Sequence, residues 1–342
     1  MKKYDIIVYI GRFQPVHNAH KEIIKRAHSL AEKVVIIVGS GWQPPTYKNP
    51  WSSIERHKML LDVINNISYK TNITIEHSYD TIYNNEAWAV RIQHIIKPYE
   101  NKCRTKPKIG IIGHDKDEST FYLKMFPQWE RIEVDLIEPL NATDIRDLYF
   151  REGMNLKFLD GVVPDTTKNF LEVYSKCSTY RQIIAERKFI EQYKKQFSGL
   201  AYPPVFATVD AIVIQSGHVL MVKRKSEPGK GLWALPGGFL NAETDKSVQD
   251  AMIRELREET GIKVPAPVLV GNIKDVRVFD AIGRSTRGRT ITHAFKIQLP
   301  AGGDLPKVKG SDDAEKAVWM SHIGSMDCYE DHYEIIQWAI GG

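Results

Sequence analysis

Short apolar runs rich in β-branched residues alternate with helix-like segments through the first half of the chain, and this alternation restricts the fold more than any other feature. The runs are Ile6–Ile10, Val34–Val38, Ile73–Glu76, Ile109–Ile112 and Ile132–Ile137. Strands that alternate with helices form βαβ units and a parallel sheet. Because the runs are almost continuously apolar, we expect helices to cover both faces of that sheet.

The pattern changes near residue 167. Residues 167–202 form a polar, helix-compatible stretch that ends in glycine and then Pro203-Pro204, which indicates a helical connector. Beyond it we expect a hairpin at Gln215-Ser216-Gly217 and a helix over about 246–260. Further strands are expected at Val268–Ile273, Val276–Phe279 and Thr290–Gln298, with a final helix after Asp331. The sequence thus predicts an α/β domain over residues 1–166, a connector over 167–202 and an α+β domain with a mixed sheet over 203–342.

Composition mainly excludes classes of protein. Among 342 residues, 47 Lys and Arg stand against 42 Asp and Glu, and the net charge of +5 is too small and too dispersed for a nucleic-acid-binding protein. The three cysteines are too widely spaced for a zinc ribbon or a disulfide framework. No segment has the ~18 apolar residues of a membrane span, and the first apolar run is too short for a signal peptide. We therefore expect a cytoplasmic protein that binds small anions, not nucleic acid or membranes, and a homo-oligomer stays open.

The stretch GRFQPVHNAH, residues 11–20, follows the first predicted strand and opens the first predicted helix. Ligands of open parallel sheets bind beyond the carboxyl ends of the strands. Gly11 allows a phosphate to approach the backbone, and the helix start offers free N–H groups. His17 and His20 share one helical face, where imidazoles can bind phosphate oxygens and stabilise developing charge. The alternative is that both histidines are ordinary residues of a helix start.

This stretch resembles the G-x-F-x-P-x-H-x-G-H signature of the nucleotidyltransferase superfamily, with Ala19 where glycine is usual. Its Arg12-Phe13-Gln14 portion is similar to the archaeal type of nicotinamide mononucleotide (NMN) adenylyltransferase. The segment NATDIR, residues 141–146, resembles the superfamily's later [I/L]-S-x-T-x-x-R signature. The resemblance implies a Rossmann-like domain in which Thr143 caps a helix and Arg146 reaches the phosphates.

Other segments resemble the substrate-recognition segments of the same subfamily, namely residues 49–56 and 83–88, and residues 113–117 are expected to line the ATP site. Trp88 could stack on a nicotinamide ring, although a core position is an equal alternative for it and for Trp51. The resemblance assigns catalysis to His17, His20 and Arg146. It assigns ATP or NMN binding to Gly11, Arg12, Phe13, Gln14, Trp51, Arg56, Asn85, Trp88, Gly113, His114, Asp115 and Thr143.

A second motif, RELREETGI over residues 254–262, lies in the second half. Glu255, Glu258 and Glu259 are spaced i, i+3 and i+4, so their carboxylates share one helix face. Such a density of oxygen ligands suits Mg²⁺ or Mn²⁺, which can bridge a diphosphate and activate water. The alternative is a solvated, charged helix face.

Together with the upstream LPGGF turn, residues 235–239, this motif resembles the Nudix box, G-x5-E-x7-R-E-U-x-E-E-x-G-U. The spacing is two residues longer than the pattern, and no glutamate occupies either counted position, Thr244 or Lys246. Glu243 or Asp245 could replace it across the insertion. The resemblance implies that Glu255, Glu258 and Glu259 bind the metal, that Glu258 also serves catalysis, and that Gly237 and Gly238 border the substrate.

An arginine-rich stretch follows the box. Within the resemblance it grips an ADP-ribose-like substrate through Arg277, Phe279, Arg284, Arg287 and Arg289. The alternative is that these arginines are ordinary surface charges without a function.

The two resemblances cover nearly the whole chain, and their order is that of the bifunctional NMN adenylyltransferase/Nudix hydrolase family. The family implies NAD synthesis from NMN and ATP, and metal-dependent hydrolysis of ADP-ribose to AMP and ribose 5-phosphate. Two alternatives remain: the first domain could adenylylate another phosphate acceptor, and the second could be a catalytically dead sensor of ADP-ribose.

Overall fold

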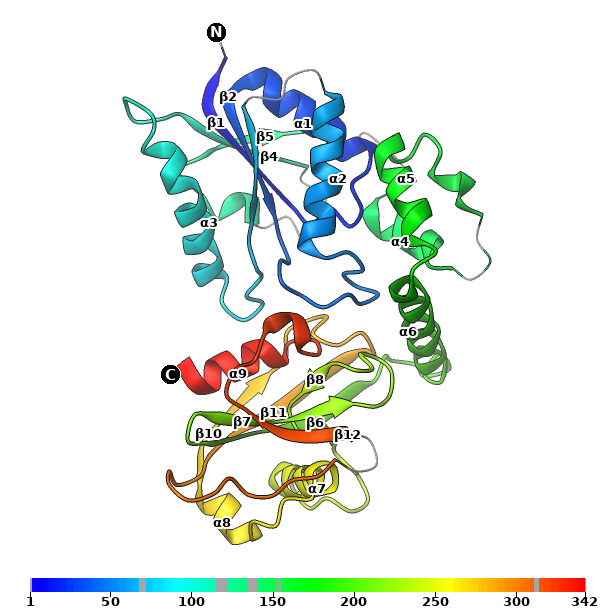
Figure 1. Ribbon diagram of the computed structural model, residues 1–342, viewed down its shortest axis with the longest axis vertical. Coiled ribbons are helices and arrows are strands. Elements are labelled where there is room, and N and C mark those ends of the chain that lie inside the picture. The colour runs from blue at the N-terminus through cyan, green and yellow to red at the C-terminus, as the bar shows by residue number, and fades with distance from the viewer. Residues whose placement is uncertain are drawn as a thin grey trace. The chain divides into compact units, whose positions relative to one another are not determined.

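The computed structural model describes residues 2–67, 72–114, 122–134, 141–151, 153, 155–310 and 314–341 (Figure 1). Contacts divide the chain into two compact units, Met1–Ile184 and Ala185–Gly342. The division lies within one long helix, α6 (Ser178–Lys195), which belongs to the stretch expected to connect the domains.

The first unit has a five-stranded sheet in the order β3-β2-β1-β4-β5, and every pair of neighbours is parallel. The strands are β1 (Tyr4–Gly11), β2 (Ala31–Val38), β3 (Ile73–His77), β4 (Ile109–Gly113) and β5 (Glu130–Glu133). The parallel sheet predicted from the apolar runs is confirmed. The fifth run is confirmed only in part, since residues 135–137 lie outside the described residues.

Helices cover both faces of this sheet because alternate residues of each strand point to opposite sides. Ile7 of β1 packs in a cluster with α1 (Asn18–Leu30), α2 (Ser53–Asn66), α4 (Ala142–Tyr149) and α5 (Asp165–Tyr174). Ile6 and Val8 pack in a second cluster with α3 (Asn85–Glu100). A short 3₁₀ helix, η2, spans Leu156–Leu159.

The second unit contains a mixed sheet with the main order β10-β11-β6-β7-β12, in which only β6 and β11 pair in parallel. Its strands are β6 (Val205–Gln215), β7 (His218–Arg224), β8 (Trp233–Ala234), β9 (Gly237–Phe239), β10 (Ile273–Phe279), β11 (Arg289–Gln298) and β12 (Ala314–Met320). Its helices are α7 (Val248–Thr260), α8 (Ala266–Gly271), η3 (Ser325–Asp327) and α9 (His332–Gly341). Val209, Ala211 and Val213 of β6 pack with Leu256 of α7, which fixes the helix against the sheet.

The predicted hairpin is confirmed: β6 and β7 pair around Ser216 and Gly217, whose φ angles of +48° and +75° suit a tight two-residue turn. The strand predicted over Val268–Ile273 is wrong for most of its length, because residues 266–271 form α8. Pro265 precedes the first turn with the backbone angle of a helix start, and only Leu269 of this helix is buried. One-sided burial of a helical turn therefore replaces the expected strand.

Each helix in the described part of the chain is too short or too polar to cross a lipid bilayer.

Candidate active sites of the two units

Gly11 ends β1, and its surroundings explain why no side chain is tolerated there. A Cβ atom on Gly11 would lie 2.8 Å from the ring of Phe13, which folds back with a φ of +53° and is 1% exposed. The Gly11 carbonyl accepts a hydrogen bond from the Gly39 N–H at 2.9 Å. Close packing beneath the loop thus requires this glycine, and the neighbouring Arg12 is exposed.

His17 and His20 lie together at the start of α1, as predicted. The backbone N–H of His17 donates to Nδ1 of His20 at 3.2 Å, and the ring centroids are 3.8 Å apart. Since Nδ1 of His20 accepts, its neutral ring carries the proton on Nε2. Burial, and then the neighbouring His17, hold the pKa of His20 well below its usual value. His20 is therefore a neutral hydrogen-bond donor at pH 7.

Arg146 joins the two sequence motifs of the first unit. It lies on α4, whose start is capped by Asn141 and not by Thr143 as expected, and its Nη1 donates to the Gln14 carbonyl at 2.6 Å. Its Nη2 donates to Thr143 Oγ1 at 3.1 Å. Burial, and then the nearby Arg12, lower the pKa of Arg146 to about 10. The residue stays charged at pH 7, beside the loop that carries the first motif.

Arg56 and Trp51 were expected to contact substrate, and the structure places both in the protein interior. Each is 1% exposed. The guanidinium of Arg56 donates to the carbonyls of Arg12, Gly39, Ser40 and Trp51 at 2.6–3.0 Å, and to that of Ser52 at 3.3 Å. The Trp51 ring packs on Tyr149, Phe150 and Tyr174. Arg56 therefore fastens the loops after β1 and β2, and Trp51 is a core residue.

The remaining candidates of the first unit lie at different depths. Asn85 is exposed at the start of α3, whereas Trp88 is half-buried, with its ring centroid 6.0 Å from Tyr122 and from Phe126. His114 follows Gly113 at the end of β4, and its Nδ1 lies 2.8 Å from the Val134 carbonyl. Asp115 lies outside the described residues.

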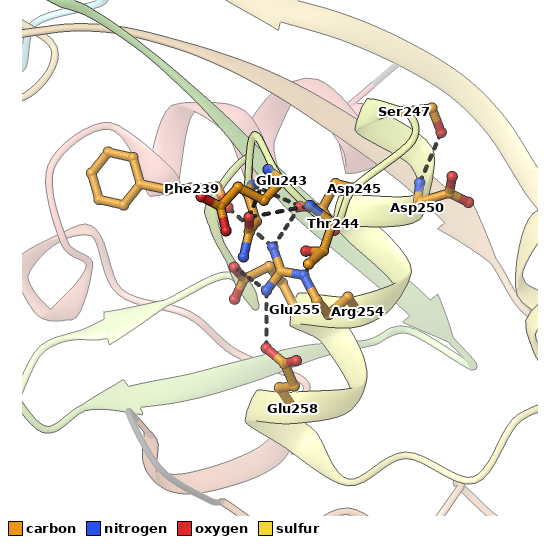
Figure 2. A network of polar contacts seen from close by, with 10 residues as sticks. Phe239, Glu243, Thr244, Asp245, Ser247, Asp250, Arg254, Glu255 and Glu258 are labelled. Atoms are coloured by element: carbon orange, nitrogen blue, oxygen red, sulfur yellow. Dashed lines mark hydrogen bonds and ion pairs between the residues drawn. The ribbon is translucent and has the colours of Figure 1, made fainter.

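In the second unit, an ion pair between Asp245 and Arg254 closes the lengthened Nudix-like box (Figure 2). Asp245 forms a two-pronged ion pair with Arg254, at 2.9 Å to Nε and 2.8 Å to Nη2, and this pair lowers the pKa of Asp245. Arg254 also donates to the Phe239 carbonyl at 3.1 Å. Glu243 is exposed, and its backbone N–H donates to Asn241. Of the two acidic residues that could take the place of the box's early glutamate, Asp245 holds the arginine.

Two glycines let the turn lie directly against the acidic helix. A Cβ on Gly238 would lie 2.5 Å from the Glu255 carboxylate, and one on Gly237 would collide with the Val209 carbonyl. The Gly237 N–H donates to Glu259 at 2.9 Å. Even so, burial raises the pKa of Glu259 to about 8, and the negative charge of the neighbouring Glu255 raises it further.

The three glutamates of the box do not all face the same space. Glu255 and Glu259 line a cavity of about 310 Å³, here called the carboxylate cavity, which Asp210 and Glu330 also line. The side chain of Glu258 is 59% exposed and lies 3.0 Å from Arg254. No three acidic, histidine or cysteine side chains in the described part of the chain are placed to hold a metal ion.

The chemistry of the carboxylate cavity nevertheless fits a divalent cation. Burial also raises the pKa of Glu255, because its charged form is desolvated beside another carboxylate. A hard cation with oxygen ligands would supply the missing counter-charge and, when bound, would polarise a diphosphate and activate water. Glu255 and Glu259 are the residues that would hold it, with Glu258 one turn away on the same helix.

Sequence reasoning missed several polar residues of the carboxylate cavity, among them Asp210, Glu330 and His332. Asp210 Oδ2 accepts from the Thr292 hydroxyl at 2.6 Å, and its Oδ1 lies 4.0 Å from Nε2 of His332. Nδ1 of His332 accepts from the Leu235 N–H at 2.9 Å, and burial lowers the pKa of this histidine. Asp210 could have been noticed in the sequence, because it is a charged residue within the apolar strand β6.

The arginines that were expected to bind one substrate together lie in different surroundings. Arg284 forms a two-pronged ion pair with Asp331 at 2.8 Å and is 7% exposed, so its role is largely structural. Arg287 lies over the Phe239 ring at 4.7 Å and, like Arg284, lines the carboxylate cavity. Phe279, expected to bind substrate, is a core residue at 1% exposure. Arg277 is exposed over the Phe279 ring, and Arg289 lies 3.8 Å from Asp280.

Known families match both units. A cytidylyltransferase-like family model matches residues 8–132, and a NUDIX domain model matches residues 205–338. The nicotinamide/nicotinic acid mononucleotide adenylyltransferase of Acinetobacter baylyi is 34% identical over 54% of this chain and 93% of its own length. The ADP-ribose pyrophosphatase of Methanocaldococcus jannaschii is 32% identical over 46% of this chain and 83% of its own length.

A solved structure matches the two units together. The bifunctional NMN adenylyltransferase/ADP ribose pyrophosphatase of Francisella tularensis, complexed with AMP and a manganese ion, is 34% identical, with a TM-score of 0.89 and 99% of each chain covered. Both units and their order are therefore shared over the full length. The chain belongs to the family of bifunctional NMN adenylyltransferase/ADP-ribose pyrophosphatase proteins.

Proposed function

We propose that the first unit makes NAD and diphosphate from NMN and ATP. An oxygen of the NMN phosphate attacks the α-phosphorus of ATP, and the bond to the departing diphosphate breaks. No covalent intermediate with the protein is needed, so catalysis consists of positioning and stabilisation of negative charge. The groups that supply these are the start of α1, His17, His20 and Arg146.

The burial of each group gives it a part in this reaction. His20, neutral at pH 7, donates a hydrogen bond from Nε2 and does not contribute a full charge. Arg146 brings a permanent charge, and Thr143 and the Gln14 carbonyl fix its guanidinium. Arg12 is exposed, and in this proposal its guanidinium contacts the phosphates. Arg56 acts indirectly, because it holds the loops on which Arg12 and Gly39 lie.

We propose that the second unit hydrolyses ADP-ribose to AMP and ribose 5-phosphate. Water attacks one phosphorus of the diphosphate, and the bond to the bridging oxygen breaks. Glu255 and Glu259 would hold Mg²⁺ or Mn²⁺ at the carboxylate cavity, and Glu258 lies on the adjacent turn of the same helix. Arg254, fastened by Asp245, keeps Glu255 in place. Arg287 lines the carboxylate cavity, and in this proposal it meets the substrate.

In this proposal residues 1–166 carry NAD synthesis, residues 203–342 carry hydrolysis and residues 167–202 connect them. The partners are ATP, NMN, NAD and ADP-ribose, within the cytoplasm. The observation that carries the proposal is the full-length similarity to a bifunctional NMN adenylyltransferase/ADP ribose pyrophosphatase.

The test uses the full-length protein with NMN, ATP and Mg²⁺, and in a separate reaction with ADP-ribose and Mg²⁺. Chromatography should resolve NAD in the first and AMP in the second. If NAD is absent, assays with FMN and pantetheine phosphate decide whether another acceptor is used. If ADP-ribose binds without release of AMP, the second unit is a sensor and not a hydrolase.

A further inference from the structure

Strand β10 is an outer strand of the mixed sheet, and no described strand pairs with its far side. It pairs with β11 in regular antiparallel register from Asp275 to Phe279, after an irregularity between Ile273 and Asp275. The Val276 N–H donates to the Asp275 carboxylate at 2.8 Å, a contact within the strand itself. An open edge of this kind is a template for a further strand.

Apolar side chains are exposed along and around this edge. Val276 and Val278 are 44% and 46% exposed, and they lie on one face of the strand because they are two residues apart. Val268 of α8, before the strand, and Ile282, after it, are exposed as well. The other outer strand, β12, is described in full and has no exposed large apolar side chain. The edge of β10 therefore offers apolar surface that an added strand would cover.

The charged residues of β10 are ordered so that the strand complements itself. Asp275 and Arg277 are exposed, carry opposite charges and stand one residue to either side of Val276. When two copies of this strand run antiparallel about a twofold axis at Val276, each Asp275 lies opposite the Arg277 of the other copy. Opposite charges directly across a strand pair stabilise the pair. A parallel pairing in register would instead place like charges beside each other.

The same antiparallel register brings the apolar side chains together. Val276 lies opposite its own copy, and Val278 lies opposite Lys274, whose aliphatic stem covers it. Because the end of one strand lies beside the start of the other, the loop with Ile282 comes to the side of α8 in the second copy, where Val268 is exposed. One twofold arrangement thus pairs the charges and covers the exposed apolar side chains.

Two features of β10 oppose pairing with an unmatched strand. A lysine on an edge strand and an irregularity in its register both hinder indiscriminate pairing. Here Lys274 and the irregularity before Asp275 confine the regular edge to a short stretch. A short edge with a fixed order of charges selects a strand of matching order, and the strand that matches it about a twofold axis is β10 itself.

We propose that β10 pairs with β10 of a second copy of this chain, so that two mixed sheets become one continuous sheet across a twofold axis at Val276. The paired stretch is residues 274–278 of each copy. So short a contact implies a dimer that forms reversibly as the protein concentration rises. This dimer does not depend on either of the proposed reactions.

Sedimentation equilibrium of the full-length protein at a series of concentrations tests the dimer. The wild-type mass should rise toward twice that of one chain. Asp275→Arg puts two arginines on the edge, and Arg277→Asp puts two aspartates there. Each variant alone should self-associate more weakly, with a dissociation constant raised about tenfold or more, because like charges then lie opposite each other.

An equimolar mixture of these two variants should recover the dimer, because every arginine then lies opposite an aspartate. Recovery also shows that both variants fold, so misfolding would not account for the loss. Lys316→Asp is the matched control, since it reverses an exposed charge on the other outer strand, β12, and should leave the dimer unchanged.

A disulfide tests the position of the twofold axis. Residues directly opposite in an antiparallel pair have Cα atoms about 4.5–5.5 Å apart, which a disulfide can span. After mild oxidation of Val276→Cys, peptide mass spectrometry should find a disulfide that joins position 276 of both copies. Val205→Cys, exposed at the start of β6, should form no such link.

Three results would overturn the proposal. The first is a wild-type protein that stays a single chain at every concentration. The second is a dimer that both charge variants leave intact, since the copies would then meet through another surface. The third is a mixture of the two variants that fails to restore the dimer.

Discussion

The two sites bury charge of opposite sign, and that difference sets what each needs from solution. Desolvation lowers the pKa of Arg146 to about 10 and raises that of Glu259 to about 8. At pH 7 the arginine remains charged, because 10 is still well above 7. The glutamate is largely protonated unless a cation joins it. The first site therefore carries its own charge for binding phosphate, whereas in our proposal the second takes up a divalent cation.

The protein surroundings reflect the same contrast. Arg146 and Arg56 donate to main-chain carbonyls, which stabilise a buried cation without neutralising it. Glu259 accepts one backbone N–H and faces other carboxylates across the carboxylate cavity.

Glu259→Gln should abolish most ADP-ribose hydrolysis and leave NAD synthesis unchanged. Loss of a buried ligand removes metal-based stabilisation worth several kcal/mol, which corresponds to a rate loss of about a thousandfold. Parallel assays of both reactions on one preparation measure this, and the unchanged reaction reports on folding. Retention of hydrolysis within tenfold would remove Glu259 from the metal site.

His17→Ala should have the opposite selectivity. Removal of a group that stabilises charge in the transition state should slow NAD synthesis about a hundredfold, while AMP release from ADP-ribose stays constant. The same pair of assays measures the result. Comparable losses in both reactions would mean that the substitution disturbs the whole chain and not one site.

Asp245→Ala should weaken hydrolysis without removing a metal ligand. Arg254 loses its two-pronged partner, so Glu255 is held less firmly, and a loss of about 10- to 100-fold is expected from such a supporting residue. Glu243→Ala is the matched control, since Glu243 is exposed in the same loop. If Glu243→Ala lowers hydrolysis more than Asp245→Ala does, then Glu243 and not Asp245 takes the place of the early glutamate of the box.

Arg56→Lys should lower the free energy of unfolding, and it should have no direct effect on ligand affinity. Lysine cannot reach the several carbonyls that the guanidinium joins, and buried carbonyls left unpaired cost about 1–3 kcal/mol each. Urea unfolding of the full-length protein measures the loss in the free energy of unfolding. The transition of the first unit is the one that shifts when ATP and NMN are added. Arg26→Lys, on the exposed side of α1, should have almost no effect. Unchanged stability with a raised KM would return Arg56 to substrate binding.

Local pattern was enough to predict the parts of the fold that depend on burial of short segments. The alternation of apolar runs with helix-like segments predicted the parallel sheet, since βαβ units place their strands in parallel. Gln215-Ser216-Gly217 predicted the hairpin, because a tight turn depends on neighbours in sequence. The region before β10 was predicted as a strand, but Pro265 starts a helix there. A short apolar run fits either element until its packing partners are known.

The sites were predictable where one motif supplies the chemistry, and less so where distant segments meet. His17 and His20 adjoin each other at the start of α1, and Arg146 of α4 contacts Gln14 in the loop that leads to them. Arg56 was misassigned because a sequence shows its donors but not the carbonyls that occupy them. Asp210 and His332 join the carboxylate cavity from strands and helices far from the box, and no spacing rule connects them.

Thermal unfolding titrated with Mn²⁺ tests most directly whether the second site needs a cation. In the wild-type protein without nucleotide, the unfolding midpoint of the second unit should rise with Mn²⁺, by an amount equivalent to about 2.7 kcal/mol at one hundred times the dissociation constant. The double variant Glu255→Gln/Glu259→Gln should show no such rise. An equal rise in both proteins, or none in the wild type, would contradict the assignment of a divalent cation to the carboxylate cavity.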